Sequence, residues 1–489
     1  MLMQILQILL VPFIFVFVSY AAGLKWGAKA GWVSFIALAY STFLILLTGW
    51  QGGAREFYDW RPIGLFGFNA DGLSVPILFT IALLCTLMSI YSIPYMSRII
   101  GEDKRQFALY YALLLLYSVG MMGAVLATNL IEFYLFFELM LIPSYFLIAK
   151  WGSGDRDRIS FMYFMWTHIG ALAFLAGILS AGYLSGSFDL ERIVTATMPA
   201  SFRLLIVVLM VMGLLVKMAA FGLHIWLPYA HAEAPTPVSA LLSPAMIGIG
   251  GYAIVRLVLT IVPSAFFQIS TALTIWAVVT MFYGGAMALV QDDIKRLLAY
   301  SSVSQMGYIL LGISSVQILG VSGAMFQYVT HGLGKGILFM VAGAIILQAH
   351  GLRRISKMGG LATKMPLTAI AALIGFFTIM GLPPTTGFIS EFLIFAGSFK
   401  EAFTLASMLR IVLSFLAVLS TALTAGYSLW AIKRIFFGKL PDELRNVTEA
   451  PWVITGSLMV LAAVSIIIGI YPDLIERLLL PSVKVIIGG

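Results

Sequence analysis

The sequence has 489 residues, of which 61% are hydrophobic and only 10% are charged, and its formal net charge is +8. A water-soluble domain carries roughly 25% charged residues, so this composition excludes a soluble fold. The single cysteine, Cys85, excludes both an intrachain disulfide and an iron–sulfur cluster held by four thiolates of this chain.

Apolar stretches of about eighteen residues or more recur from end to end, and each is long enough to cross a bilayer as a helix. We therefore expect an all-α polytopic membrane protein that forms one transmembrane domain over residues 1–489. The pattern predicts fourteen helices, near residues 3–20, 31–49, 73–92, 108–126, 130–149, 160–184, 204–221, 238–262, 268–290, 297–314, 319–348, 366–397, 408–432 and 452–471.

The basic residues of the predicted loops are divided unevenly between the two sides of the membrane. If the chain crosses at every predicted helix, 18 of the 29 lysines and arginines follow odd-numbered helices, and 8 lie on the opposite side. Cytoplasmic loops are enriched in Lys and Arg. We therefore expect a multi-pass protein of a prokaryotic-type inner or plasma membrane, with both termini outside the cytoplasm, and the net charge requires no nucleic-acid partner.

Two predicted helices carry segments typical of helix breaks. The seventh runs into residues 221–228, which end in a proline, and the twelfth contains residues 381–387 with two prolines between glycines. Irregular backbone at membrane depth occurs where protein or water satisfies it, and breaks at corresponding places in two halves indicate internal repeats with an ion site at the breaks. We expect two inverted five-helix repeats, about 108–262 and about 268–432.

Four ionisable residues inside the predicted helices, Glu138, Lys217, Lys335 and Glu391, mark the candidate site together with several histidines. A charged side chain costs about 2.5–3.5 kcal/mol at a helix centre, so each needs a partner, water or a function. Glu138 lies in the middle of the fifth helix and is predicted to relay protons, the alternative being an ion pair that pins two helices. Lys217 precedes the first break, where carbonyl groups favour a cation. Glu391 follows the second break, where free amides favour an anion.

Histidines add to this set. His331 and Lys335 are one helical turn apart, so they share a face and could pass a proton through water near neutral pH. The glycines between them also favour close helix packing, which leaves a structural role open. His224 and His231 flank Pro228 at the first break and either support ion transfer or hold irregular backbone in place.

Two further residues are expected to lie outside the transport site. His168 is interpreted as a core histidine, and Glu132 as an interfacial or partner-contact residue near a helix start. The sequence has no glycine-rich phosphate loop, no dinucleotide fingerprint and no Cys/His spacing typical of metal sites. We therefore expect this chain to bind no cofactor and to carry out no redox catalysis by itself.

The stretch from Lys217 to Ala240, KMAAFGLHIWLPYAHAEAPTPVSA, resembles the antiporter-like subunits of respiratory complex I and of multisubunit cation/proton antiporters. Further matching motifs lie at residues 69–74, 137–143, 293–308, 331–335 and 381–392. The resemblance implies fourteen helices, inverted repeats with broken seventh and twelfth helices, and a hydrophilic axis. Its ion-translocating residues correspond to Glu138, Lys217, Lys335 and Glu391.

Two positions distinguish this chain within the family that it resembles. A glutamate at position 391 resembles the M-type subunit, whereas other members have lysine there. Gly248 stands where many members carry a lysine on the eighth helix, so the middle of the path would depend on His331, Lys335 and water.

The resemblance implies a subunit that translocates H⁺ or Na⁺ within a membrane-bound respiratory complex of the NADH-quinone oxidoreductase kind, coupled to electron transfer in other subunits. Membrane arms of archaeal hydrogenases and sulfur-reducing complexes contain similar subunits. Three alternatives stay open: a subunit of a Na⁺/H⁺ antiporter, a non-pumping scaffold, and a haem or quinone protein that uses His168 and His331.

Overall fold

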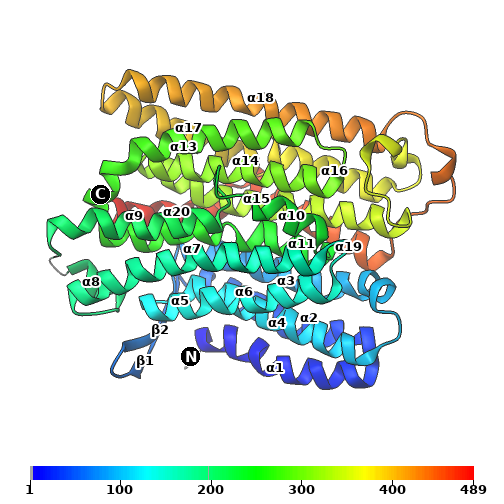
Figure 1. The fold of residues 1–489 in the computed structure, drawn as a ribbon, viewed down its shortest axis with the longest axis horizontal. Helices are drawn as coiled ribbons and strands as arrows, with labels where there is room; N and C mark the ends of the chain where they lie inside the picture. The colour runs from blue at the N-terminus through cyan, green and yellow to red at the C-terminus, as the bar shows by residue number, and fades with distance from the viewer. Residues whose placement is uncertain (1–3, 196–197, 489) are drawn as a thin grey trace.

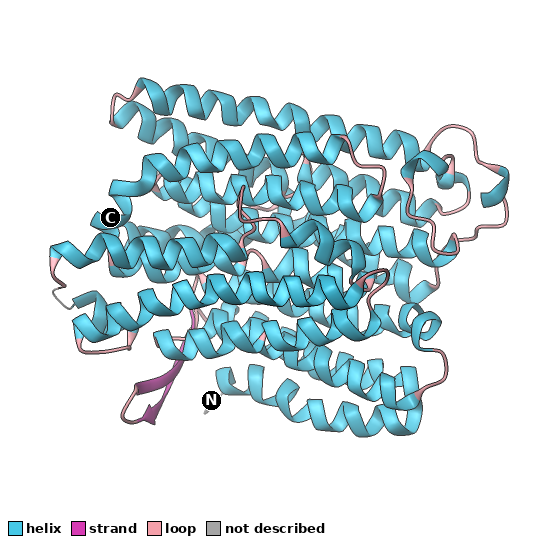
Figure 2. Ribbon diagram, viewed as in Figure 1, coloured by secondary structure: helices cyan, strands magenta, loops and turns pink. Residues whose placement is uncertain are grey.

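The computed structural model describes residues 4–195 and 198–488, which form a bundle of long helices that run side by side (Figure 1). Connecting loops gather at the two ends of the bundle, and one small β-hairpin projects from one end (Figure 2). The helices are α1 (Gln4–Trp26), α2 (Ala30–Trp50), α3 (Ser74–Ile100), α4 (Lys104–Leu126), α5 (Leu130–Leu139), α6 (Leu141–Trp151), α7 (Arg156–Ser185), α8 (Leu190–Thr195), α9 (Ala200–Lys217), α10 (Trp226–Glu233), α11 (Thr236–Leu241), α12 (Ile249–Ala253), α13 (Pro263–Leu289), α14 (Ile294–Ser314), α15 (Ile318–Gln348), α16 (Pro366–Ile379), α17 (Gly387–Thr404), α18 (Met408–Phe436), α19 (Trp452–Ile470) and α20 (Asp473–Ile487).

The polytopic helical fold is confirmed. Within the described residues, twelve helical stretches are long and apolar enough to cross a membrane. The first of them, Gln4–Trp50, contains both α1 and α2, which pack against each other, and α16 is a shorter apolar helix. The exact number of fourteen crossings stays a prediction.

Both predicted helix breaks are present. Helix α9 ends at Lys217, and the chain is non-helical until α10 begins at Trp226; α16 ends at Ile379, and α17 begins at Gly387. Glycines with positive φ lie in each break, at Gly222 (φ 83°) and Gly381 (φ 69°), where an L side chain would be strained. The first break starts four residues earlier than the predicted end of the seventh helix at residue 221.

A third irregularity was not predicted. The stretch expected as one helix over 238–262 consists of α11 and α12 alternating with two π-helical turns, Leu242–Met246 and Ile254–Leu259. Pro244 lies in the first turn and has no amide hydrogen to donate, so the regular hydrogen-bond ladder cannot continue there. Such π turns occur frequently at functional sites.

The predicted loop over residues 50–72 is also more ordered than expected. It forms an antiparallel hairpin of β1 (Ala54–Trp60) and β2 (Gly64–Ala70), with Ala54 opposite Ala70 and Trp60 opposite Gly64. Aromatic residues are frequent in both strands, which favours β structure. The hairpin therefore reaches from α2 to the start of α3 as a defined element.

Helix α15 occupies the centre of the bundle and positions the candidate site. It packs against α3, α11, α14, α16, α17, α19 and α20, and nearly all of its residues are buried. By contrast, α1, α2 and α18 bury one face and expose apolar side chains on the other, as expected of helices that contact lipid. The polar residues of α15 consequently lie far from bulk water.

Candidate ion-translocation site

Glu138 lies next to the end of α5 and is joined to His168 of α7. The Glu138 Oε2 and His168 Nδ1 atoms are 3.0 Å apart, while Glu138 Oε1 is buried and has no hydrogen-bond partner among the described residues. The His168 ring also stacks on Phe164. His168, interpreted from the sequence as a core histidine, has a part-exposed side chain and a partner, the acid proposed to relay protons.

Lys217 is the last residue of α9 and is buried beside α5. Its ammonium nitrogen lies 4.9 Å from the centroid of the Phe137 ring, and the charge of Glu138 acts on it. No ion pair within 4 Å joins Lys217 to Glu138 in the described part of the chain. The family resemblance implies a glutamate–lysine pair here, but the Glu138 carboxylate bonds to His168 and the Lys217 ammonium lies over an aromatic face.

The two histidines of the first break differ in their surroundings. His224 Nδ1 accepts a hydrogen bond from the Gly222 N–H (3.2 Å), and its ring packs on Tyr283, so this residue holds the non-helical backbone. His231, on α10, is fully buried and stacks on Phe339 of α15. Neither ring nitrogen of His231 has a hydrogen-bond partner among the described residues.

Lys335 and His331 face the centre of the bundle from α15. The Lys335 ammonium donates to the Leu298 carbonyl (3.1 Å) and to the Ser301 hydroxyl, both on α14. Ser301 in turn donates to the Tyr427 hydroxyl at 2.7 Å. His331 is buried, with no hydrogen-bond partner for either ring nitrogen within the described chain.

Glu391 lies one turn after the start of α17, and its carboxylate points back to the second break. A Cβ placed on Gly381 would lie 2.6 Å from Glu391 Oε2, so the glycine leaves room for the carboxylate in this position. Glu391 Oε1 is buried and has no partner in the part of the chain that the structure describes. A buried carboxylate with free hydrogen-bonding capacity is well suited to bind and release a cation or proton.

A row of amide and hydroxyl groups lies beside this carboxylate. Ser390 donates to Gln327 Oε1, and Gln327 donates to Gln305 Oε1, each at 2.5 Å. Gln305 also donates to the carbonyl of Ile379, the last residue of α16 (3.1 Å). Sequence reasoning missed this row, although a glutamine inside an apolar helix, where polar groups are costly, was a usable signal.

The space beside Gly248 is occupied. A Cβ at Gly248 would lie 2.5 Å from Tyr328 Cδ2 and still closer to Cε2, and the Tyr328 hydroxyl donates to the Ala245 carbonyl at 2.6 Å. The tyrosine ring therefore fills the position into which a side chain at 248 would extend.

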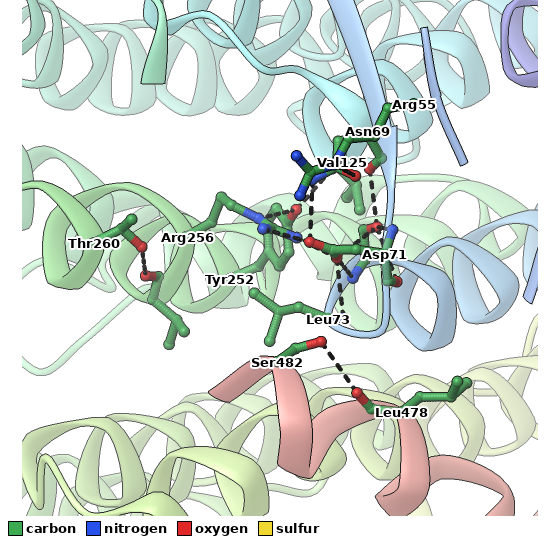
Figure 3. A network of polar contacts seen from close by, with 12 residues as sticks. Arg55, Asn69, Asp71, Leu73, Val125, Tyr252, Arg256, Thr260, Leu478 and Ser482 are labelled. Atoms are coloured by element: carbon green, nitrogen blue, oxygen red, sulfur yellow. Dashed lines mark hydrogen bonds and ion pairs between the residues drawn. The ribbon is translucent and has the colours of Figure 1, made fainter. Parts of the chain in front are cut away.

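A separate network of charged residues lies near the hairpin (Figure 3). Arg256 binds Asp71 through two hydrogen bonds of 2.8 and 2.5 Å and also donates to the Tyr252 hydroxyl. Burial alone would raise the pKa of Asp71, but the charge and hydrogen bonds of Arg256 more than offset it and lower that pKa to about 2. The network joins the loop before α3 to the second π turn, beside a cavity of about 40 Å³ that Arg256 helps to line.

Glu132 belongs to the same end of the bundle and is fully buried. Its Oε2 accepts hydrogen bonds from the amides of Gly67 (3.1 Å) and Thr128 (3.3 Å), so it fastens β2 to the start of α5. The expectation of an interfacial residue is therefore wrong. Sequence position near a helix start did not reveal that the hairpin covers it.

Metal-binding groups and cavities bear on what this axis could hold. The described residues contain no group of three or more His, Cys, Asp or Glu side chains that could hold a metal ion. A cavity of about 630 Å³ lies elsewhere, between α2, α3, α19 and α20, and its lining is apolar apart from Arg477. The polar axis is thus built from side chains packed inside the bundle.

Comparison with known proteins shows which family the chain belongs to. Residues 127–418 match the family model described as NADH:quinone oxidoreductase/Mrp antiporter, TM. The chain belongs to this family. The F(420)H(2) dehydrogenase subunit M of Methanosarcina mazei is 32% identical to this antiporter-like subunit, over 98% of the chain and 97% of the relative.

Solved structures of similar proteins have the same fold as this chain. The antiporter-like subunit superposes on a chain of respiratory complex I from Thermus thermophilus with a TM-score of 0.87 and 28% identity, covering all of both chains. It superposes equally well on a chain of the Mrp complex from Dietzia sp., with a TM-score of 0.87 and 25% identity, covering all of this chain and 52% of the other. The predicted resemblance, including the M type, is confirmed.

Proposed function

We propose that this antiporter-like subunit translocates H⁺ or Na⁺ across the membrane as part of a larger respiratory complex, in which other subunits carry out electron transfer. The observation that supports the proposal most directly is the row of ionisable groups on α5, α9, α15 and α17, which are buried on α9, α15 and α17 and partly buried on α5, at or beside both helix breaks. Charged groups are too costly inside a membrane to be retained there without a partner or a function.

The ion path follows the order of these groups along the bundle. A change of charge at Glu138 and His168 alters the proton affinity of Lys217, because the Glu138 charge acts on that ammonium. Protons released from Lys217 pass by His331 and Lys335 to Glu391. His231 supports the middle of the path, and His224 stabilises the first break.

We also propose a location, partners and an internal repeat for this chain. The chain is a multi-pass subunit of a prokaryotic-type inner or plasma membrane, with both termini outside the cytoplasm, in contact with other membrane subunits and binding no cofactor itself. The two repeats, 108–262 and 268–432, each contribute one broken helix. A subunit of a Na⁺/H⁺ antiporter is the second candidate, favoured by the likeness to the Mrp chain.

Redox-driven ion pumping by the intact complex in sealed vesicles tests the function. Lys217→Ala removes the ammonium, and we expect it to lower the number of ions pumped per electron while assembly and electron transfer persist. Unchanged pumping per electron would instead favour the scaffold. Pumping that requires Na⁺ in the medium would identify Na⁺ as the ion, and cation exchange without any electron donor would favour the antiporter.

A further inference from the structure

Lys295 is a buried basic residue that the path described above does not use. It is the second residue of α14, only 3% of its surface is exposed, and its ammonium donates to the carbonyls of Ala234 and Ala232 (3.4 Å to Ala232). Both acceptors lie at the end of α10. Lysine is almost never buried without a counter-ion, and the described residues provide no carboxylate within 4 Å of this ammonium.

The end of α10 connects Lys295 to the axis. His231 precedes Ala232, and its buried ring has no hydrogen-bond partner among the described residues. The charges of both Lys295 and Lys335 act on this ring, which stacks on Phe339, one turn beyond Lys335 on α15. The contact of Lys295 with the Ala232 carbonyl and the contact of the His231 ring with Phe339 thus link three basic residues in a series from the start of α14 to the centre of the bundle.

The outer end of the series is close to water. Asp293, two residues before Lys295, pairs with Arg353 at 2.7 Å, and about a quarter of each of these side chains is exposed. Asp293, Arg353 and Glu233 are the charged groups that act on Lys295. The loops that carry Asp293 and Arg353 lie on the side predicted to face the cytoplasm.

We propose that Lys295 takes up protons from this side and passes them through the His231 imidazole to Lys335. A solvent proton binds the Lys295 amine; the resulting ammonium gives a proton to one ring nitrogen of His231, directly or through water, and the other ring nitrogen gives its proton to the Lys335 amine. Lys295 is then a neutral amine again, Lys335 passes its proton on toward Glu391, and rotation of the His231 ring restores the tautomer that accepts the next proton. This inference rests on the proposed transport function.

The competing role is structural, because a cation beside the carbonyls at the end of a helix stabilises that end. Lys295→Arg separates the two roles, since an arginine keeps the charge at the carbonyls but does not release a proton. His231→Gln provides a second variant, and it removes the imidazole without breaking any hydrogen bond of the described chain. Arg296→Gln is the matched control, because Arg296 is exposed on the same turn.

The assay is ion pumping per electron by the intact complex in sealed vesicles, with Lys217→Ala measured in parallel. We expect Lys295→Arg and His231→Gln to lower pumping to the value of Lys217→Ala, while Arg296→Gln pumps like the unmodified complex. If Lys217→Ala lowers pumping but Lys295→Arg or His231→Gln does not, the uptake route is overturned and the proposed function stands. If Lys217→Ala also pumps normally, the proposed function fails as well.

Discussion

The contact between Gly248 and Tyr328 allows a quantitative prediction. Gly248→Ala adds one methyl group, which would lie 2.5 Å from Tyr328 Cδ2, about 1 Å closer than an ordinary contact. The ring cannot move freely, because its hydroxyl is bonded to the Ala245 carbonyl. Overpacking costs about 1–3 kcal/mol, and losing the hydrogen bond adds about 1 kcal/mol. We therefore expect Gly248→Ala to destabilise the subunit by about 2–4 kcal/mol.

Thermal unfolding of the purified complex, monitored as the release of this subunit, measures the loss of stability. The control is Gly248→Ala combined with Tyr328→Leu, which opens space beside the new methyl group. We expect the double variant to be more stable than the sum of the two single changes predicts, because the residues are in contact. A Gly248→Ala complex as stable as the unmodified one would refute the packing argument and show that a side chain at 248 has room.

Two further predictions concern charged pairs. The ordinary pKa of an aspartate is 3.8, and Arg256 lowers the pKa of Asp71 to about 2 in the folded protein. The ion pair therefore stabilises the fold by about 2 kcal/mol above pH 4, and this stabilisation is lost as the pH falls from 4 to 2. Acid unfolding measures this stabilisation, and we expect the Asp71→Asn variant to lose the extra pH dependence between pH 4 and 2. An acid transition that is the same in both proteins would contradict the role of the Asp71–Arg256 pair. Glu401 and Arg410 are both buried, and their charged groups are 3.8 Å apart. Glu401→Gln should therefore destabilise the chain by roughly 3–5 kcal/mol in thermal unfolding. A destabilisation of less than about 1 kcal/mol would mean that the pair is solvated.

Features encoded by neighbouring residues could be predicted from the sequence. The two breaks were located because proline removes an amide donor and glycine permits positive φ, which are local properties. The candidate ion-binding residues were found because a charge inside an apolar stretch stands out. Glu138, Lys217, Lys335 and Glu391 are all buried in the structure or nearly so, although transport by them stays a prediction.

Contacts between distant segments could not be predicted in this way. His168 is 30 residues from Glu138 and on another helix, so nothing in its local sequence indicates that the two side chains meet. Glu132 is covered by a hairpin that begins more than sixty residues earlier. Arg410 lies near the start of α18, and nothing in its local sequence indicates that Glu401 and polar groups of α13 surround it inside the bundle.

Two sets of charged groups inside this chain differ in how they are paired, and the difference bears on function. Asp71 with Arg256, and Glu401 with Arg410, are paired acid to base, as expected of groups that fasten helices. Three buried lysines, at 217, 295 and 335, have no carboxylate within 4 Å in the described chain, and contact aromatic faces, carbonyls or a hydroxyl instead.

An ammonium held only by neutral groups stays sensitive to charges farther away, because electrostatic interactions are weakly screened inside a bundle. A tight ion pair would fix the charge and oppose proton release. A scaffold would gain nothing from unpaired lysines at the centre, since each of them costs free energy to bury. The same chain pairs Asp71 and Glu401 with arginines and leaves these lysines without a carboxylate, and this contrast favours an axis that exchanges protons over a purely structural one.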